Sequence, residues 1–227
     1  MSDKVDFDKY IENYDELLSE GTRFFTSNEN YFASYKANIA SNKIAFEPYR
    51  ILEFGCGTGR NIGPICSAFP KSQVEGSDIA EQSLVYAKKQ NPSVTFFLED
   101  GKKQERKKYD LIFVAGVFHH IALNERLEIL KGLLDRLTKN GEVFIFEHNP
   151  FNPITQKIVS NCPYDADAVL IKPKELKNLL KNAGFKVQNH EYCLFFPPKL
   201  SFLKAFENKL GWLPLGGQYW VSAKKED

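Results

Sequence analysis

Residues 51–60 read ILEFGCGTGR, an apolar run that ends in an acid and is followed by glycines at alternate positions, 55, 57 and 59. The run from Tyr49 to Phe54 predicts a strand, the glycines predict a turn, and the residues after Arg60 predict a helix. Glycine permits positive φ and lets another molecule approach the backbone closely. The first turn of the helix would direct free N–H groups and its positive dipole end at the turn. We therefore expect a ligand with a negatively charged group to lie across residues 55–59.

The spacing of the glycines separates several kinds of ligand. A dinucleotide fingerprint requires glycine three residues after the second glycine, where this chain has Arg60. A P-loop would end in Gly-Lys-Ser/Thr, which is absent. The sequence EFGCGTG at 53–59 resembles the first motif of the class I S-adenosylmethionine (SAM)-dependent methyltransferases. Three glycines also suit an ordinary tight turn between strand and helix. The choice between a ligand-binding motif and such a turn therefore depends on the segments downstream.

Composition narrows the class of protein. A chain of 227 residues with 43% hydrophobic and 26% charged residues is expected to form one globular domain, residues 1–227. A formal net charge of +1 gives no field that favours nucleic acid as a partner. The four cysteines are scattered and form no CxxC or Cys/His cluster, so we expect no metal site. We expect no signal peptide and no membrane span, and hence a cytoplasmic protein.

The first 45 residues predict a helical cap. Apolar side chains recur at spacings of three and four on one helix face: Tyr10, Ile11, Tyr14, Leu17 and Leu18. An aromatic group follows, made of Phe24, Phe25, Tyr31, Phe32 and Tyr35. We favour packing of this group onto the core, and a lid over a substrate pocket is the alternative.

Acidic residues follow the next two predicted strands. Asp78 ends the strand at 73–79, nineteen residues after Gly59. One carboxylate can accept hydrogen bonds from both hydroxyls of a ribose, and ligands of open α/β sheets lie beyond the carboxyl ends of the strands. The alternative for Asp78 is the N-cap of a helix at 81–90. The strand at 94–98 leads to Asp100 and Gly101, which also suit a solvated turn.

The second half of the sheet brings histidines to the same edge. The run at 109–114 reads as a buried parallel strand and leads to His119 and His120. A helix at 124–137, ended by Asn140-Gly141, precedes a strand at 142–148 that finishes in Glu147 and His148. A loop at 149–153, a helix at 173–185 and strands at 186–196 and 218–222 complete the pattern.

The ordered motifs extend the resemblance to about residues 45–225. The sequence DLI at 110–112, VFHH at 117–120 and KNGE at 139–142 are similar to later motifs of the class I methyltransferases. The resemblance implies an α/β fold, a doubly wound seven-stranded mostly parallel sheet with an antiparallel last strand, an N-terminal helical cap and an inserted helix before the last strand. It implies a SAM-binding half, 46–150, and an acceptor-side half, 151–227.

The resemblance also implies roles for individual residues. The cofactor would be SAM, with S-adenosylhomocysteine (SAH) as product. Its methionine part would lie on Gly55, Gly57 and Gly59, and Glu53 would orient that loop or hold the amino group. Asp78 would hold the ribose, Ile79 would lie beside the adenine, and Asp100 with Gly101 would contact the adenine amine. Ala115 would lie near the transferred methyl group.

Methyl transfer to a hydroxyl is helped by a base. His119 is the first candidate, because histidine titrates near neutrality, and Glu147 and His148 are rivals. A packed structural role is the alternative for each histidine. No Asn/Asp-Pro-Pro-Tyr/Phe motif follows the fourth strand, and no basic face for RNA is evident. The expected acceptor is a small molecule, a sugar or a lipid-like compound.

An insertion at 197–216 precedes the last strand. Apolar residues recur on one predicted helix face: Leu200, Phe202, Leu203, Phe206, Leu210 and Trp212. We favour a helix packed on the domain, and a peripheral membrane or dimer contact through 199–213 is the alternative. Two other functions stay open, an NAD(P)-dependent oxidoreductase with an atypical turn and a non-catalytic SAM-binding protein.

Overall fold

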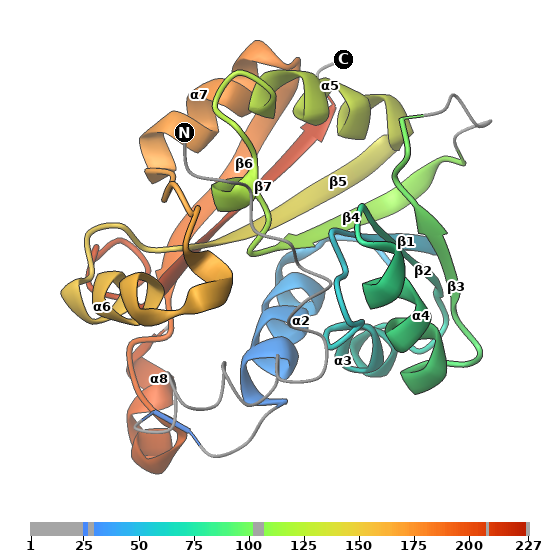
Figure 1. Ribbon diagram of the computed structural model, residues 1–227. Coiled ribbons are helices and arrows are strands. Elements are labelled where there is room, and N and C mark those ends of the chain that lie inside the picture. The colour runs from blue at the N-terminus through green and yellow to red at the C-terminus, as the bar shows by residue number, and fades with distance from the viewer. Residues whose placement is uncertain (1–24, 27–29, 102–106, 208, 226–227) are drawn as a thin grey trace.

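A computed structural model describes residues 25–26, 30–101, 107–207 and 209–225 of the chain. The predicted N-terminal helix face and Phe24 lie outside these residues. The described part folds around one sheet with helices on both faces (Figure 1).

The sheet has seven strands in the order β3-β2-β1-β4-β5-β7-β6. Strands β1 to β5 pair in parallel, and β7 is antiparallel to both β5 and β6. The predicted doubly wound, mostly parallel sheet is therefore confirmed. The strand bounds are β1 Arg50–Phe54, β2 Gln73–Asp78, β3 Thr95–Leu98, β4 Tyr109–Ala115, β5 Leu137–His148, β6 Phe185–Cys193 and β7 Gln218–Lys225.

Helices α2, α3 and α4 cover one face of the sheet, and α5 and α7 cover the other (Figure 1). The helix bounds are α2 Tyr31–Lys43, α3 Ile62–Ala68, α4 Glu81–Gln90, α5 Arg126–Arg136, α6 Pro153–Asn161, α7 Pro173–Asn182 and α8 Lys204–Glu207. Three short 3-10 helices are η2 Phe118–His120, η3 Pro163–Asp165 and η4 Pro198–Leu203.

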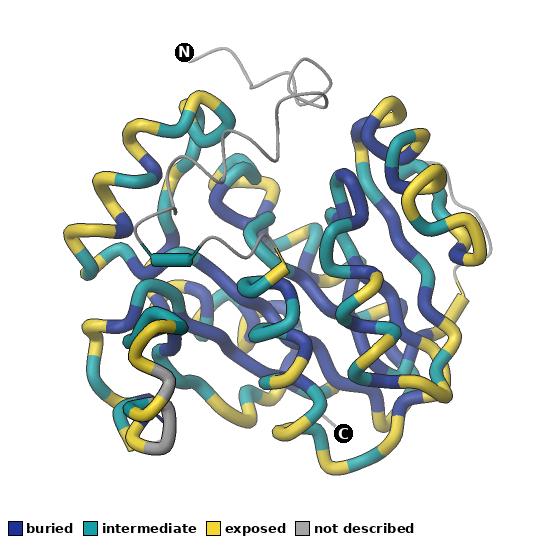
Figure 2. The backbone as a smooth tube through the Cα atoms, turned by 90° about the horizontal axis from the view of Figure 1, so that it is seen from below, coloured by how far each residue is buried: buried dark blue, intermediate teal, exposed yellow. Residues whose placement is uncertain are grey.

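The apolar strands are buried on both faces because the sheet separates two cores (Figure 2). Alternate residues of β4 point to opposite sides. Ile112 and Val114 pack with α5 and α7, whereas Leu111 and Phe113 pack with α2 and α3. This double burial explains why the sequence of β4 is continuously apolar rather than alternating.

The aromatic group before β1 packs on the core, as favoured from the sequence. Phe25, Tyr31, Phe32 and Tyr35 lie against the core under α2 and α3. The ring centroids of Phe25 and Phe32 are 5.6 Å apart. The Tyr35 hydroxyl also accepts a 3.3 Å hydrogen bond from Leu194 N, which ties α2 to the residue after β6.

Two element predictions need correction. Asn140 and Gly141 do not end a helix, because α5 stops at Arg136 and both residues lie within β5. The register of β4 against β5 shifts there, from Tyr109–Leu137 to Leu111–Glu142.

The insertion is not one packed helix either. It forms η4 and the four-residue α8, and three of its large apolar side chains, Phe202, Phe206 and Trp212, are 71%, 57% and 76% exposed. A helix this short has too few turns to bury the apolar face that the periodicity suggested.

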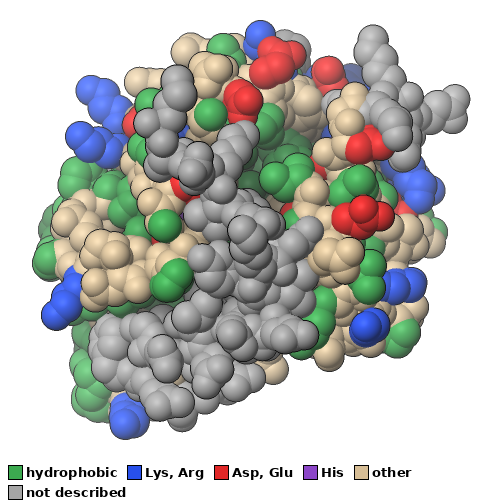
Figure 3. Space-filling view, viewed as in Figure 1, with side chains coloured by type: hydrophobic (Ala, Val, Ile, Leu, Met, Phe, Trp, Pro, Cys, Tyr) green, Lys and Arg blue, Asp and Glu red, His purple; other side chains and the backbone are tan. Residues whose placement is uncertain are grey.

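Positively charged side chains are dispersed on the face seen in Figure 3. Lys and Arg side chains lie scattered around its rim and do not gather into one basic patch. Within the described ranges, no helix is both long enough and apolar enough to span a lipid bilayer.

Candidate functional site

The strand order places the topological switch point of the sheet between β1 and β4. The chain runs outward from β1 to β3 in one direction and from β4 to β5 in the other. Ligands of open parallel sheets bind at such a switch point, beyond the carboxyl ends of the strands. The chain there supplies the glycine turn, Asp78, Ala115 and the Glu147-His148 pair from four neighbouring strands.

The glycine turn is locked onto the end of β2. The backbone φ angles of Gly55, Gly57 and Gly59 are +70°, +50° and +79°. Residues with a side chain rarely adopt such positive values. A Cβ on Gly55 would lie 2.4 Å from a methyl carbon of Val117, whereas a Cβ on Gly57 would meet no described atom within 4 Å. Gly57 N donates to Asp78 Oδ2 at 2.7 Å. The turn is thus held in place and leaves open space above Gly57.

Asp78 fixes two loops with its two oxygens. Besides holding Gly57 N, it accepts a 2.9 Å hydrogen bond from Ala80 N through Oδ1. It is not the N-cap of α4, which is Ala80 and makes no side-chain cap hydrogen bond. A carboxylate oxygen can accept more than one hydrogen bond, so both stay competent to receive a donor from a ligand. Ile79, beside it, is 68% exposed.

Glu53 is a buried carboxyl with an unused oxygen. Its side chain is 1% exposed, and its Oε1 accepts a 2.6 Å hydrogen bond from Asn61 Nδ2. Its Oε2 has no hydrogen-bond partner among the described residues. Burial raises the pKa of Glu53 to about 8, although Asn61 and Lys36 oppose the shift. A ligand that brings a positively charged donor would satisfy this oxygen and favour its ionised form.

The end of β3 is more open. Asp100 and Gly101 are exposed, and Gly101 has φ of +73°. The neighbouring Glu99 is committed to a 2.6 Å ion pair with Arg136 at the end of α5. Asp100, rather than Glu99, is therefore the acid that faces outward at this edge.

Glu147 organises the loop after β4. Its Oε1 accepts hydrogen bonds from Val117 N at 3.2 Å and Phe118 N at 2.8 Å, and its Oε2 lies 2.7 Å from His119 Nδ1. Burial would raise the pKa of Glu147, but the charge and hydrogen bond of His119 outweigh this and lower it. With both oxygens engaged, Glu147 is placed to position His119.

Three of the four histidines gather beyond β4 and β5. The ring of His119 lies 4.2 Å from that of His120 and 5.0 Å from that of His148, centroid to centroid. Burial alone would lower the pKa of His119, but Glu147 and Asp165 raise it to about 9. Burial lowers the pKa of His148 to about 4.

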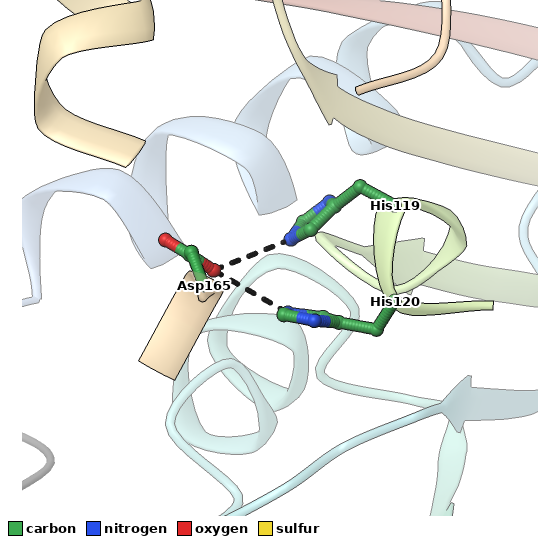
Figure 4. Close-up of side chains that lie close together, drawn as sticks. All are labelled: His119, His120 and Asp165. Atoms are coloured by element: carbon green, nitrogen blue, oxygen red, sulfur yellow. Dashed lines mark ion pairs between the residues drawn. The ribbon is translucent and has the colours of Figure 1, made fainter. Parts of the chain in front are cut away.

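Asp165 of η3 faces two of these rings (Figure 4). Its Oδ1 lies 3.5 Å from His119 Nε2 and 3.4 Å from His120 Nε2. Burial would raise the pKa of Asp165, but both histidines lower it well below its usual range. We call His119, His120 and Asp165 the His–Asp cluster.

Most residues predicted for the site come together at one edge of the sheet. The sequence did not reveal the roles of Asn61 and Lys36 beside Glu53, or that Asp165 faces the histidines. Burial lowers the pKa of Lys36, and Glu53 and Glu147 oppose that shift. The one sequence signal for these roles was the position of Asn61 at the start of the predicted helix, directly after the glycine turn.

Comparisons with known proteins find a matching sequence domain and matching folds. Residues 52–143 match a family model described as a methyltransferase domain. The fold matches a SAM-dependent methyltransferase from Archaeoglobus fulgidus with a TM-score of 0.69 and 18% identity, over 93% of this chain and 100% of that one. It also matches the plantazolicin methyltransferase BpumL in complex with SAH, with a TM-score of 0.62 and 21% identity, over 96% and 90% of the two chains.

A curated relative extends the match in sequence. Malonyl-[acyl-carrier protein] O-methyltransferase 2 of Ilyobacter polytropus is 36% identical over 107 residues, 44% of this chain and 39% of the relative. Residues 52–143 therefore match a methyltransferase domain, and the fold of the chain is the fold of a SAM-dependent methyltransferase. The chain spans less than half the length of the curated relatives that it matches at 30% identity or more.

Proposed function

We propose that this methyltransferase transfers the methyl group of SAM to an oxygen of a small-molecule or lipid-like acceptor. The observation that carries the cofactor site is the buried Glu53, whose unused oxygen lies at the end of β1 where the glycine turn begins. That oxygen needs a donor, and the amino group of SAM supplies one.

The other parts of SAM have fitting partners along the same edge. The methionine part would lie over Gly55, Gly57 and Gly59, and a Cβ on Gly57 would meet no described atom within 4 Å. The ribose hydroxyls would donate to Asp78, whose carboxylate is already held rigid by two backbone N–H groups. The adenine would cover Ile79, an apolar side chain otherwise 68% exposed, and its amine would reach Asp100 and Gly101.

When bound, SAM supplies a methyl group already activated by a sulfonium. The chain must then hold the acceptor oxygen in line with that methyl group and exclude water. Such alignment can contribute about 7–11 kcal/mol toward the barrier. The methyl group would lie near Ala115, and the acceptor would approach His119 and His148. Glu147 would fix the His119 ring, and His119 is our candidate for the residue that positions the acceptor oxygen.

Support for an oxygen acceptor comes from the curated relative, which is named an O-methyltransferase of a malonyl group carried on a protein. A malonyl group offers a free carboxylate, which needs no base before it is methylated. Exposed apolar side chains on α6 and in the insertion favour an acceptor with an apolar portion. Ile154 is 56% exposed and Phe202 is 71% exposed.

The first experiment is a calorimetric titration of the protein with SAH. Asp78→Ala should abolish binding. Asp110→Ala is the matched control, because Asp110 also holds two backbone N–H groups, those of Tyr49 and Arg50, at 3.0 Å. It lies at the start of β4, at the opposite edge of the sheet, and should leave SAH affinity unchanged. A folded wild-type protein that does not bind SAH would contradict the assigned site.

Turnover is tested next, with radiolabelled SAM and three acceptor classes: acyl thioesters with a free carboxylate, long-chain amphiphiles and bulk tRNA. Labelled product in either of the first two supports the proposal. Labelled tRNA would contradict it. SAH binding with no turnover on any acceptor would favour a non-catalytic SAM-binding protein. NADH in the calorimeter is the negative control, since an oxidoreductase would bind it.

A further inference from the structure

We propose that the His–Asp cluster binds a divalent transition metal ion through His119 Nε2, His120 Nε2 and Asp165 Oδ1. These three atoms lie within 4.8 Å of one another (Figure 4). The proposal deepens the proposed function, because it makes the acceptor a compound with a metal-binding oxygen. The metal site itself does not depend on that function.

The distances suit a shared metal better than direct hydrogen bonds. Asp165 Oδ1 is 3.5 and 3.4 Å from the two Nε2 atoms. Good N–H···O hydrogen bonds measure about 2.7–3.2 Å. Two ligands that each lie about 2.1 Å from a tetrahedral ion are about 3.4 Å apart. Both measured separations therefore match edges of a coordination tetrahedron.

The outer nitrogens of both rings are held as metal-binding histidines require. His119 Nδ1 lies 2.7 Å from Glu147 Oε2, and His120 Nδ1 lies 3.0 Å from Asp167 Oδ1. A carboxylate on Nδ1 keeps the proton there, orients the ring and makes Nε2 the more basic ligand. Each ring therefore has its own carboxylate partner at Nδ1, Glu147 for His119 and Asp167 for His120.

The charges around the cluster also favour a cation. Glu147, Asp165 and Asp167 bring three carboxylates to the two rings. A divalent ion would offset this excess and let both rings bind as neutral ligands. The side chains of His120 and Asp165 are each 10% exposed, so an ion can enter from solvent, whereas His119 is 2% exposed.

The backbone holds the two halves of the cluster together. Val169 N donates to His119 O at 2.8 Å, and Arg126 donates to Val169 O at 2.7 Å. The segment that carries Asp165 is thus fixed to η2 before any ion binds, which is the pre-organisation that a metal site needs.

The sequence predicted no metal site because adjacent histidines with an aspartate forty-five residues away match no ligand spacing. Two histidines and one carboxylate leave coordination positions open, and sites of this composition suit zinc, cobalt and iron. An open position would take the acceptor oxygen. For a hydroxyl acceptor, the ion would lower the pKa of the hydroxyl and its proton would pass to water. The oxygen then forms the new bond to the methyl carbon while the carbon–sulfur bond breaks and leaves its electron pair on sulfur.

The test is a titration of the full chain, stripped with chelator, with Co²⁺ in the absence of SAM and acceptor. We expect one equivalent to give visible absorption from a low-symmetry site, and Zn²⁺ to displace it. His120→Gln and Asp165→Asn should each weaken Co²⁺ binding by at least about tenfold, and Asp167→Asn, which removes support behind the ring, by about tenfold.

Matched controls are His190→Gln on β6 and Asp135→Asn, an exposed aspartate on α5, which should bind Co²⁺ like the wild type. Circular dichroism checks that each variant folds. No cobalt absorption in the folded wild type, or equal affinity in the cluster variants and the controls, would overturn the proposal. SAH titrated into the same samples reports the cofactor site separately, so loss of one site is distinguishable from loss of the other.

Discussion

At the scale of single residues, Glu53 should make cofactor binding depend on pH. Its pKa is raised from an ordinary 4.5 to about 8 by burial, so the free protein holds this carboxyl protonated at neutral pH. The amino group of SAH favours the ionised form. Affinity should therefore rise with pH toward about 8, by up to about tenfold per pH unit, and then level.

Calorimetry in two buffers of different ionisation enthalpy measures this effect as proton release on binding near pH 7. Glu53→Gln should remove both the proton release and the slope. Folding stability should change with pH in the opposite direction to SAH affinity. The reason is that the Glu53 carboxyl loses its proton at a lower pH in the unfolded chain than in the folded one. Glu53 should therefore reduce the stability of the free protein as pH rises from about 5 to about 8. A pH-independent SAH affinity in the wild type would disprove the role of Glu53.

Substitution by alanine should change stability in opposite directions at two glycines. Gly55 has φ of +70°, and an added Cβ would lie 2.4 Å from Val117, so Gly55→Ala should lower the free energy of unfolding by about 2 kcal/mol or more. Gly63 lies within α3 and an added Cβ would meet no described atom within 4 Å. Gly63→Ala should raise stability by about 0.5–1 kcal/mol. Urea denaturation measures both, and equal effects would contradict the argument.

At the scale of elements, Arg126 joins α5 to the segment after η3. Its side chain is 1% exposed and donates to Ile121 O at 3.0 Å and Val169 O at 2.7 Å. Arg126→Leu leaves both buried carbonyls without these donors and should cost about 3–5 kcal/mol. Because Val169 also bonds His119, the variant should weaken Co²⁺ binding as well.

The control on the same helix is Lys131→Leu. Lys131 is exposed and forms a 3.5 Å ion pair with the exposed Glu128, so the change in stability should stay within about 0.5 kcal/mol. Chemical denaturation compares the two variants. A similar small loss in both would mean that Arg126 does not anchor the segment.

At the scale of the whole molecule, cofactor binding should stabilise the fold as one unit. The two cores share every central strand, so neither can unfold while the other stays intact. SAH at about 100 times its dissociation constant should then add about 2.7 kcal/mol to the free energy of unfolding. Thermal scans should show one transition that SAH moves upward in the wild type and leaves unmoved in Asp78→Ala. Two transitions, with only one responding, would contradict a single cooperative unit.

The sequence by itself determined the sheet and the edge at which we propose that the cofactor binds, because both depend on local patterns. Buried parallel strands are apolar over their whole length, and the glycine turn requires residues that tolerate positive φ. The order of the strands then brings Glu53, Asp78 and Ala115 to one edge without further information. The prediction that Asn140-Gly141 end a helix was wrong, because a shift in strand register leaves no periodic signal.

Only the tertiary structure decided the arrangement of side chains beyond β4 and β5, where we propose that the acceptor binds. Glu147 became a positioning group because both its oxygens are engaged across loops that are close in space and distant in sequence. Asp165 lies beside the two histidines because hydrogen bonds from Arg126 to Val169 O and from Val169 N to His119 O hold the segment after η3 against η2. Contacts between segments far apart in the chain depend on packing and side-chain geometry, and no spacing within a single sequence encodes them.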